Sequence, residues 1–421
     1  MGVTTELTVG ELRSTGRRRS MLLMLGPAFV AAVAYIDPGN FATNFAAGSG
    51  YGYQLVWVVV MANVMAMLVQ YLSAKLGLAT GLNLPELCRR EYGRRTNVML
   101  WVQAEIVAMA TDLAEFVGAA IALNLLFGMP MLPAGIVTAV LSFAILALRN
   151  RGFRAFELAI IALLGLVAAG FGYLVIRAGD YPPRELMHGL IPDLSGAGAP
   201  ALAVGIIGAT VMPHVVYLHS ALHQNRISAD TDADRQTLLR YNRADCLIGL
   251  GVAGLINLAM LAIAASLFHR GGGSEVSDLQ QVHHELGTLL GGGAALAFAV
   301  ALLASGLSSS SVGTQSGQVV MSGFMRLRLP VYLRRAITMA PALLLLALGI
   351  DTTQALIFSQ IVLSFGIPFA LVPLLLLSRR RDVMGALANR PLTTVAMAVV
   401  TTVIIVLNVY LLADTIAGWI T

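Results

Sequence analysis

The sequence predicts an all-α integral membrane protein with eleven transmembrane helices: two inverted repeats of five helices and one added helix. Of the 421 residues, 57% are hydrophobic and 12% are charged, and the mean hydropathy is +0.79. Soluble proteins carry about 25% charged residues. Two of the long apolar runs are interrupted by proline, and these breaks set the predicted repeat.

Runs of about 20 apolar residues are typical of helices that span a bilayer. Between the second and third runs lies a polar, arginine-rich stretch, 80–95, in which Asn83–Leu87 predicts the start of a short helix. The predicted spans are 21–47 (broken), 53–78, 97–127, 131–148, 155–177, 200–223 (broken), 245–268, 287–321, 334–349, 352–377 and 392–417.

The distribution of lysine and arginine predicts the orientation, because cytoplasmic loops are rich in both. With the N-terminus in the cytoplasm, 24 of the 27 lie inside, and Arg177, Arg184 and Arg270 lie outside. An odd number of spans places the C-terminus outside. We therefore expect a multi-pass protein of the cell inner (plasma) membrane.

The predicted organisation follows from these spans. Arg17–Arg19 before an apolar run, with Ala32–Ala34 beyond, resembles a signal peptide, but the many later spans favour a basic anchor before the first helix. The units are a cytoplasmic segment 1–20, a first repeat 21–178, an extracellular loop 179–199, a second repeat 200–377, and a cytoplasmic loop with the eleventh helix, 378–421.

Charge and cysteine content exclude two other classes. The net charge of +5 does not indicate nucleic-acid binding, because the basic residues sit in short loops between apolar runs. Cys88 and Cys246 lack metal-ligand spacing and imply no disulfide framework, so we interpret both as ordinary thiols.

The first break is the segment Ala34-Tyr35-Ile36-Asp37-Pro38-Gly39-Asn40. An aspartate at the centre of a membrane helix costs roughly 2.5–3.5 kcal/mol, so such residues are functional by default. Pro38 interrupts the helix, and free backbone groups at membrane depth are tolerated only in a protein-lined cavity. The alternative for Asp37 is a structural salt bridge or a helix cap.

The second break is Ala209-Thr210-Val211-Met212-Pro213-His214, about 174 residues further along. Five spans separate the breaks. Because five is odd, the second unit runs in the opposite direction, which is typical of transporters with inverted repeats and a site between broken helices.

The two breaks together offer the ligands of a divalent transition metal. Asp37 supplies an anionic oxygen, Asn40 a neutral oxygen and Met212 a thioether, and free carbonyls are expected near Ala34 and Ala209. Magnesium and calcium prefer oxygen alone, whereas manganese and ferrous iron fit this mixture, and softer ions such as cadmium follow. The alternative for Met212 is an apolar filler.

Three acids in the third span predict a proton path. Glu105, Asp112 and Glu115 are spaced by seven and three residues, which places them on one helical face. The alternative is that they pair with arginines of neighbouring helices, for which Arg334 and Arg335 are candidates.

Further polar residues extend both predictions. His214 and His219 are candidate proton carriers, although a histidine in a helix is often only hydrogen-bonded. Gln70 and Gln360 lie deep in spans. Gln70 is a candidate residue of the proton path and Gln360 a further candidate oxygen ligand, and helix–helix hydrogen bonding is the alternative for both.

Small and polar residues elsewhere predict helix packing. The stretch Gly306–Gln318 permits close helix approach, and Asn257 and Asn408 are expected to form contacts between helices. For the outer loop 269–286 an ordinary solvated loop is favoured over metal collection. Its candidate ligands are His283, His284 and Glu285.

Three motifs together resemble the Nramp family, over essentially the whole chain and most closely its bacterial proton-coupled manganese transporters. The first two are Asp37–Asn40 and Met212–His214, the latter followed by Tyr217-Leu218-His219-Ser220. The third is Gly306–Gln318, closing in Met321-Ser322-Gly323-Phe324.

The resemblance implies the LeuT-like fold, and symport of Mn²⁺, also Fe²⁺ and Cd²⁺ or Co²⁺, with protons into the cytoplasm. It implies no resident cofactor, no nucleic-acid partner, no enzyme activity and a monomer. Implied metal ligands are Asp37, Asn40, Met212, the carbonyls of Ala34 and Ala209, and Gln360 in some states. Implied proton-pathway residues are Asp37, His214, Asp112, Glu115, Glu105, Arg334 and Arg335.

Two positions depart from the family pattern. Val215 stands where many members have Asn, and Ser316 where Ala is common, which puts only details of gating in doubt. Met212 argues against relatives that move magnesium or aluminium. An amino-acid symporter of the same fold and a metal channel remain alternatives; an intramembrane hydrolase is disfavoured because no His-Glu-x-x-His motif is present.

Overall fold

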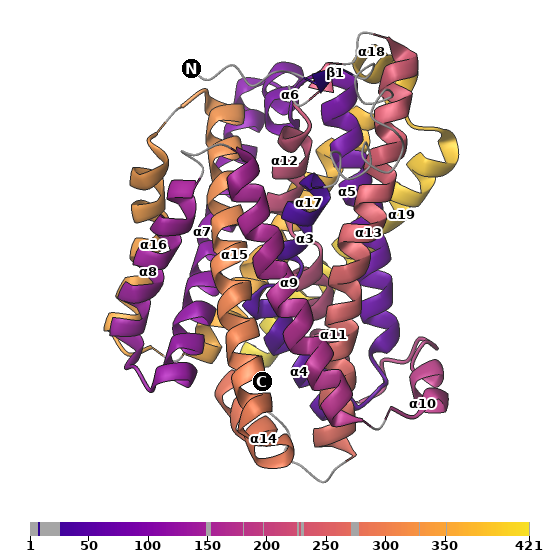
Figure 1. The fold of residues 1–421 in the computed structure, drawn as a ribbon. Coiled ribbons are helices and arrows are strands. Elements are labelled where there is room, and N and C mark those ends of the chain that lie inside the picture. Colours follow the sequence, from indigo (N-terminus) through magenta and orange to yellow (C-terminus); the bar gives the residue numbers. More distant parts are fainter. Residues whose placement is uncertain are drawn as a thin grey trace.

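The computed structural model is a bundle of helices that run mostly along one axis (Figure 1). It describes residues 7–8, 26–148, 153–179, 181–196, 198–224, 227–228, 231–270, 278–327, 329–350 and 352–420. Most of the predicted segment 1–20 therefore lies outside the described residues. Within it, β1 (Leu7–Thr8) pairs in parallel with β2 (Ile227–Ser228), with Leu7 opposite Ile227.

The helices coincide with the predicted spans. The first half of the chain contains α3 (Pro27–Ala34), α4 (Pro38–Tyr51), α5 (Val56–Thr80), α6 (Leu84–Glu91), α7 (Arg94–Phe127), α8 (Met131–Ala147), α9 (Phe153–Ala178) and α10 (Pro183–His188). The second half contains α11 (Ala199–Thr210), α12 (Pro213–Leu222), α13 (Asp232–Ala264), the π-helix η2 (Ala265–His269), α14 (Leu279–Leu290), α15 (Gly292–Met325), α16 (Val331–Ala347), α17 (Thr352–Ser378), α18 (Arg381–Met384), the 3-10 helix η3 (Gly385–Leu387) and α19 (Pro391–Ile420).

Eight helical stretches among the described residues are long and apolar enough to cross a bilayer, and one of them is the broken pair α11 and α12. The helix α8 is apolar but shorter. The all-helical class is thus confirmed, while the count of eleven spans stays a prediction.

Two predicted segments differ from the structure, and a third is confirmed. The seventh span begins at Asp232 instead of 245, because Thr231 caps the helix by accepting from the N–H of Asp234 and the polar stretch that follows stays helical. The stretch 269–286 is not a simple loop, since α14 begins at Leu279 and Asp278 caps it. The predicted short helix is confirmed as α6, where Asn83 and Glu86 form a capping box.

The arrangement of the two broken helices sets the position of the site. Helix α4 packs against α11, and α3 packs against α12, so the first half of each broken helix contacts the second half of the other. Two antiparallel helices cross in this way. The breaks therefore meet near the middle of the bundle.

Close packing around the breaks depends on glycine. In α7, a Cβ at Gly118 would overlap the ring of Pro38, and in α15 a Cβ at Gly306 would crowd the backbone of α7 at Ala119. This confirms the prediction that the small residues around Gly306 permit close helix approach. The arginine-rich α6 and α18 lie at one end of the bundle, and α10 and α14 at the other (Figure 1).

Candidate metal-binding site

Proline creates both breaks by the same backbone mechanism. Residue i+4 normally donates its N–H to the carbonyl of residue i in an α-helix. Pro38 stands four residues after Ala34, and Pro213 four residues after Ala209, and proline has no N–H. Each proline therefore leaves the carbonyl of an alanine without its helical partner. Each also occupies the first position of the next helix, where its fixed φ is favourable.

Asp37 and Asn40 bring the first break into contact with the second. Asp37 is the N-cap of α4, and its Oδ1 accepts from the backbone N–H of Asn40 at 2.8 Å. The side-chain Nδ2 of Asn40 donates to Asp37 Oδ1 at 2.7 Å and to the carbonyl of Ala209 at 2.9 Å. A carboxylate oxygen and a free carbonyl, 172 residues apart (209 − 37), thus converge on one atom.

The remaining predicted ligands are buried at the same breaks. Asp37, Asn40 and Met212 are each 0% exposed, and Gln360 is 6% exposed. A Cβ at Gly39 would overlap the amide of Gln360, so α17 brings this side chain directly against the first break. Asp37 Oδ2 and both amide atoms of Gln360 have no hydrogen-bond partner among the described residues.

This donor set differs from that of a conventional metal site. Within the described part of the chain, no group of three or more His, Cys, Asp or Glu side chains is placed to hold a metal ion. The donors at the two breaks are instead one carboxylate, two amides, a thioether and backbone carbonyls, of which Asp37, Asn40 and the Ala209 carbonyl are in contact. Such a mixed set with one charge suits reversible binding of a divalent transition metal.

Two of the three predicted acids of α7, Glu105 and Asp112, are paired with arginines of α16, as the alternative interpretation held. Arg335 Nη1 lies 2.7 Å from Asp112 Oδ1, and both side chains are buried. Arg334 contacts both carboxylate oxygens of Glu105, at 2.7 and 3.1 Å. Pairing does not exclude a relay, because a buried row of carboxylates needs compensating charge.

Glu115 connects these pairs to the metal site. It is 0% exposed, and neither carboxylate oxygen has a hydrogen-bond partner among the described residues. Asp37 and Asp112 both lie near enough to act on its charge. In α15, a Cβ at Gly313 would come within 2.9 Å of Glu115 Oε2 and 3.3 Å of Asp112 Oδ1. The acids Asp37, Glu115 and Asp112 therefore form a buried series.

The two predicted histidines lie in different networks. His214 Nδ1 lies 3.2 Å from the hydroxyl of Thr111, the residue before Asp112, so His214 joins the second break to the acid series. His219 Nδ1 lies 2.9 Å from Gln70 Oε1. Gln70 in turn donates to the hydroxyl of Tyr35. Among the described residues, no hydrogen bond joins the His219 network to His214.

Sequence reasoning missed several groups that fix the breaks. The hydroxyl of Thr210 donates to Asn40 Oδ1 at 3.3 Å, and Ser305 donates to the carbonyl of Ile36. Asn257, predicted only as a contact between helices, donates to the carbonyl of Tyr35 at 2.8 Å. Hydroxyl and amide groups are frequent in membrane helices, so no local signal marks these as part of the site.

Three predictions concern residues outside the site. Burial raises the pKa of the Cys88 thiol well above its usual range, which fits an ordinary thiol. His283, His284 and Glu285 lie on α14, and burial, with the neighbouring His284, lowers the pKa of His283. They form no metal-holding cluster of the described residues. Asn408 contacts Ser364, which confirms its predicted role between helices.

The family follows from comparison with known proteins. Residues 28–414 match the family described as Natural resistance-associated macrophage protein-like, Nramp. The chain belongs to the Nramp family. The chain is 52% identical to the divalent metal cation transporter MntH of Deinococcus radiodurans, covering 95% of this chain and 92% of that protein. It is 50% identical to the MntH of Bacillus subtilis, covering 94% and 93%.

Solved structures agree with this membership. A mutant of the manganese transporter of Eremococcus coleocola superposes with a TM-score of 0.84 at 32% identity, covering 96% of this Nramp chain and 88% of that one. A transporter of the nucleobase-cation-symport-1 family superposes with a TM-score of 0.63 at 15% identity, covering 92% and 90%, which shows the fold alone. The LeuT-like fold class and a transporter rather than an enzyme are thereby confirmed.

Proposed function

We propose that this Nramp protein imports divalent transition metal ions together with protons by alternating access. Mn²⁺ is the proposed primary substrate, and Fe²⁺, Cd²⁺ and Co²⁺ are further ones. The observation that carries the proposal is the convergence of Asp37 Oδ1 and the Ala209 carbonyl on Asn40 Nδ2, beside buried Met212. Its relatives, a divalent metal cation transporter and a manganese transporter, support it.

In this proposal the Asn40 amide exchanges roles when metal binds. Its Nδ2 donates to Asp37 Oδ1 and to the Ala209 carbonyl, and so holds these two oxygens together as a bound cation would. A metal ion in that place requires the amide to turn its Oδ1 inward, away from Thr210. The proposed ligands are then Asp37, Asn40, Met212, the carbonyls of Ala34 and Ala209, and Gln360.

Burial of the site supports alternating access. Because Asp37, Asn40 and Met212 are fully buried, a metal ion reaches them only if the bundle opens on one side. Broken helices with a site at mid-membrane are typical of transporters that rock one bundle against the other. The membrane potential contributes about 2.3 kcal/mol per charge per 100 mV toward inward movement.

The proposed proton path begins at Asp37. When Mn²⁺ binds the carboxylate, the displaced proton passes to the buried series of Glu115 and Asp112, with His214 as a branch through Thr111. Arg335 and Arg334 supply the counter-charges for Asp112 and Glu105. His219 and Gln70 are proposed as a separate polar route on the side of α12.

The remaining features of the proposal concern location and assembly. We place the N-terminus and the arginine-rich end in the cytoplasm and the C-terminus outside the inner membrane. The proposed repeats are 21–178 and 200–377. The protein acts as a monomer without a resident cofactor.

One assay tests the proposal as a whole. Purified protein is reconstituted in liposomes, and Mn²⁺ uptake and internal pH are recorded together at several imposed pH gradients. Saturable Mn²⁺ uptake with internal acidification is expected. Flux that does not saturate would indicate a channel, and uptake of amino acids driven by sodium would indicate the alternative symporter.

A further inference from the structure

A polar cavity lies at the arginine-rich end of the bundle, away from the candidate metal site. Its volume is about 500 Å³, and it lies between α5, the polar extension of α13 and the segment that leads into α19. Four of its lining side chains are cationic: Lys75, Arg240, Arg243 and Arg390. The lining contains no aspartate or glutamate among the described residues.

Lys75 is the innermost of these cations. It is 8% exposed, and its Nζ donates to Asn389 Oδ1 at 2.7 Å. Asn389 is oriented for this contact, because its own Nδ2 donates to the hydroxyl of Ser378 at 2.8 Å. One neutral acceptor satisfies only one of the three donors of an ammonium group. A buried ammonium with a single neutral partner is costly unless a counter-charge binds.

The neighbouring charges increase that cost. Arg243 and Arg390 lie close enough to repel the Lys75 ammonium. The guanidinium of Arg243 lies 5.4 Å from the ring centroid of Tyr71, whose face attracts a cation but carries no net charge. None of Lys75, Arg240, Arg243 and Arg390 forms an ion pair with another described residue. The fold has concentrated positive charge here without neutralising it.

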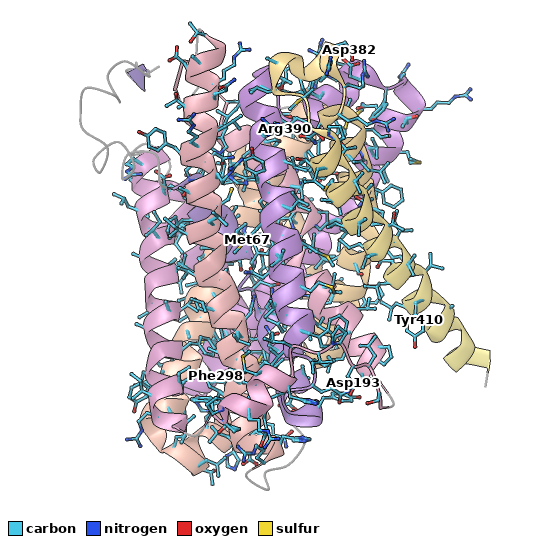
Figure 2. The ribbon with its side chains drawn as sticks, turned by 90° about the vertical axis from the view of Figure 1, so that its right-hand side faces the viewer. Met67, Asp193, Phe298, Asp382, Arg390 and Tyr410 are labelled. Atoms are coloured by element: carbon cyan, nitrogen blue, oxygen red, sulfur yellow. The ribbon has the colours of Figure 1, made fainter. Side chains whose placement is uncertain are left out.

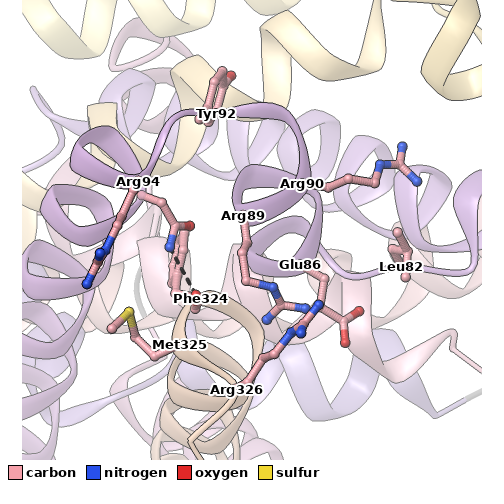
Figure 3. Close-up of a pocket in the computed structure, with 10 residues that line it drawn as sticks. Leu82, Glu86, Arg89, Arg90, Tyr92, Arg94, Phe324, Met325 and Arg326 are labelled. Atoms are coloured by element: carbon pink, nitrogen blue, oxygen red, sulfur yellow. Dashed lines mark hydrogen bonds between the residues drawn. The ribbon is translucent and has the colours of Figure 1, made fainter.

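A larger basic cavity at the same end shows the contrast (Figure 3). There Arg89 donates to the carbonyls of Ser322 and Gly323 at the end of α15, and Arg90 pairs with Glu91 at 2.8 Å. Glu86 also lines that cavity. Arg89 and Arg90 are thus bound by the fold itself, whereas the cations around Lys75 remain available for a ligand.

The surroundings of the Lys75 cavity indicate the source of the ligand. On this face α5 lies between α13 and α19 (Figure 2). Leu247 follows Arg243 by four residues and Arg240 by seven, so it lies on the same face of α13, and it is 54% exposed. On α19, Leu392 and Val395 are 81% and 59% exposed. Apolar, lipid-accessible surface therefore begins one turn from the cationic cavity.

We propose that this cavity binds the phosphate of an anionic phospholipid, with the acyl chains lying along the exposed apolar surface of α13 and α19. Guanidinium and ammonium groups both bind phosphate well, and basic pockets between membrane helices on the cytoplasmic side hold anionic headgroups. That the lipid belongs to the cytoplasmic leaflet rests on the orientation proposed above. The binding itself does not depend on metal transport.

The bound lipid would connect three parts of the chain, of which α19 contacts α5 only slightly. Lys75 belongs to the first proposed repeat, Arg243 to the second, and Arg390 to the segment before the added helix α19. A phosphate shared by all three stabilises α19 against the bundle. We therefore expect the lipid to raise the thermal unfolding temperature of the protein.

The test is native mass spectrometry and thermal unfolding of the full-length protein in a non-ionic detergent. Phosphatidylglycerol, phosphatidylcholine and inorganic phosphate are added separately. We expect phosphatidylglycerol to bind at about tenfold lower concentration than phosphatidylcholine, which corresponds to about 1.4 kcal/mol. Arg243→Gln with Arg390→Gln should abolish that preference and the thermal stabilisation.

The matched control is Arg379→Gln with Arg381→Gln, which removes the same charge from exposed positions at the same end outside this cavity. Retained preference is expected there. If the test variant fails to fold, Lys75→Met replaces it, and Mn²⁺ uptake reports folding. Equal lipid preference in test and control variants would overturn the proposal. Stabilisation by inorganic phosphate without any lipid preference would overturn it in favour of a soluble anion.

Discussion

The two helix breaks form by the same backbone mechanism but carry N-cap side chains of different chemistry. In each, a proline removes the N–H that would bind the carbonyl four residues earlier, at Ala34 in one and Ala209 in the other. The N-cap residues differ. Asp37 caps α4 through the N–H of Asn40, whereas the thioether of Met212 makes no cap on α12. Methionine is a poor N-cap, so its place at the break needs another reason, and metal ligation supplies one.

The surroundings of the two breaks differ as well. Neighbouring helices hold the first break in place, because Asn257 and Ser305 donate hydrogen bonds to the carbonyls of Tyr35 and Ile36. The second break is connected to the buried acids of α7, since His214 directly follows Pro213 and contacts Thr111, the residue before Asp112. In the proposed site the first break therefore supplies the charged ligand, while the second supplies the soft thioether ligand and a connection toward Asp112.

Replacing Asp37 by Asn should have the largest effect. Asparagine is also a good N-cap, so α4 should keep its start, and only the charge is lost. We expect Mn²⁺ uptake into liposomes to fall by at least about 100-fold, equivalent to about 3 kcal/mol of lost binding. The control is Asp193→Asn, an exposed residue of the outer segment whose carboxylate binds Ser195. Normal uptake by the Asp37 variant would sink the assignment of the first break as the charged half.

Replacing Asp112 by Asn tests what lies beyond the second break. The amide oxygen can still accept from Arg335, so the pair keeps a hydrogen bond and loses a protonatable group. We expect proton flux to fall on the order of 30-fold, with Mn²⁺ flux less affected, as for loss of a proton-transfer group. Glu105→Gln is the comparison, since Glu105 pairs with Arg334 in the same way. Equal losses of proton and metal flux would show that the Asp112 pair is structural.

Replacing Met212 by Ala should change selectivity more than rate. Loss of a thioether removes a ligand that a transition metal uses and calcium does not. We expect Cd²⁺ and Mn²⁺ to compete for uptake about tenfold more weakly, which corresponds to about 1.4 kcal/mol of lost binding free energy, and we expect Ca²⁺ uptake to become measurable. Met67→Ala, on α5, is the methionine control. Unchanged selectivity between Mn²⁺ and Ca²⁺ would defeat the thioether argument.

The sequence predicted the breaks because their signals are local. Proline in an apolar run, an aspartate at membrane depth and an odd number of intervening spans each follow from residue order alone. The acids of α7 were placed on one face for the same reason, since helical spacing fixes it. The segment Asn83–Leu87 likewise predicted the start of α6, where the structure shows a capping box of Asn83 and Glu86.

The remaining features depend on contacts between distant segments. Nothing near Thr111 or Thr210 shows that one contacts His214 and the other Asn40, because α7, α12 and α4 meet only in the folded bundle. The predicted start of the seventh span, at residue 245, was wrong for another reason. Apolar content marks the membrane-embedded part of a helix, and the polar residues after Thr231 continue the helix beyond it.

The prolines offer the smallest and most direct test of the comparison. Pro213→Ala restores an N–H opposite the Ala209 carbonyl, and Pro38→Ala does the same for Ala34. A net hydrogen bond contributes about 1 kcal/mol, and metal must then displace it, so we expect roughly fivefold weaker Mn²⁺ binding by calorimetry in each variant. Pro341→Ala, an exposed proline within α16, restores the same kind of bond away from the site and should leave affinity unchanged. A loss confined to Pro213→Ala would show that only the second break contributes a carbonyl, and no loss in either would remove the backbone from the ligand set.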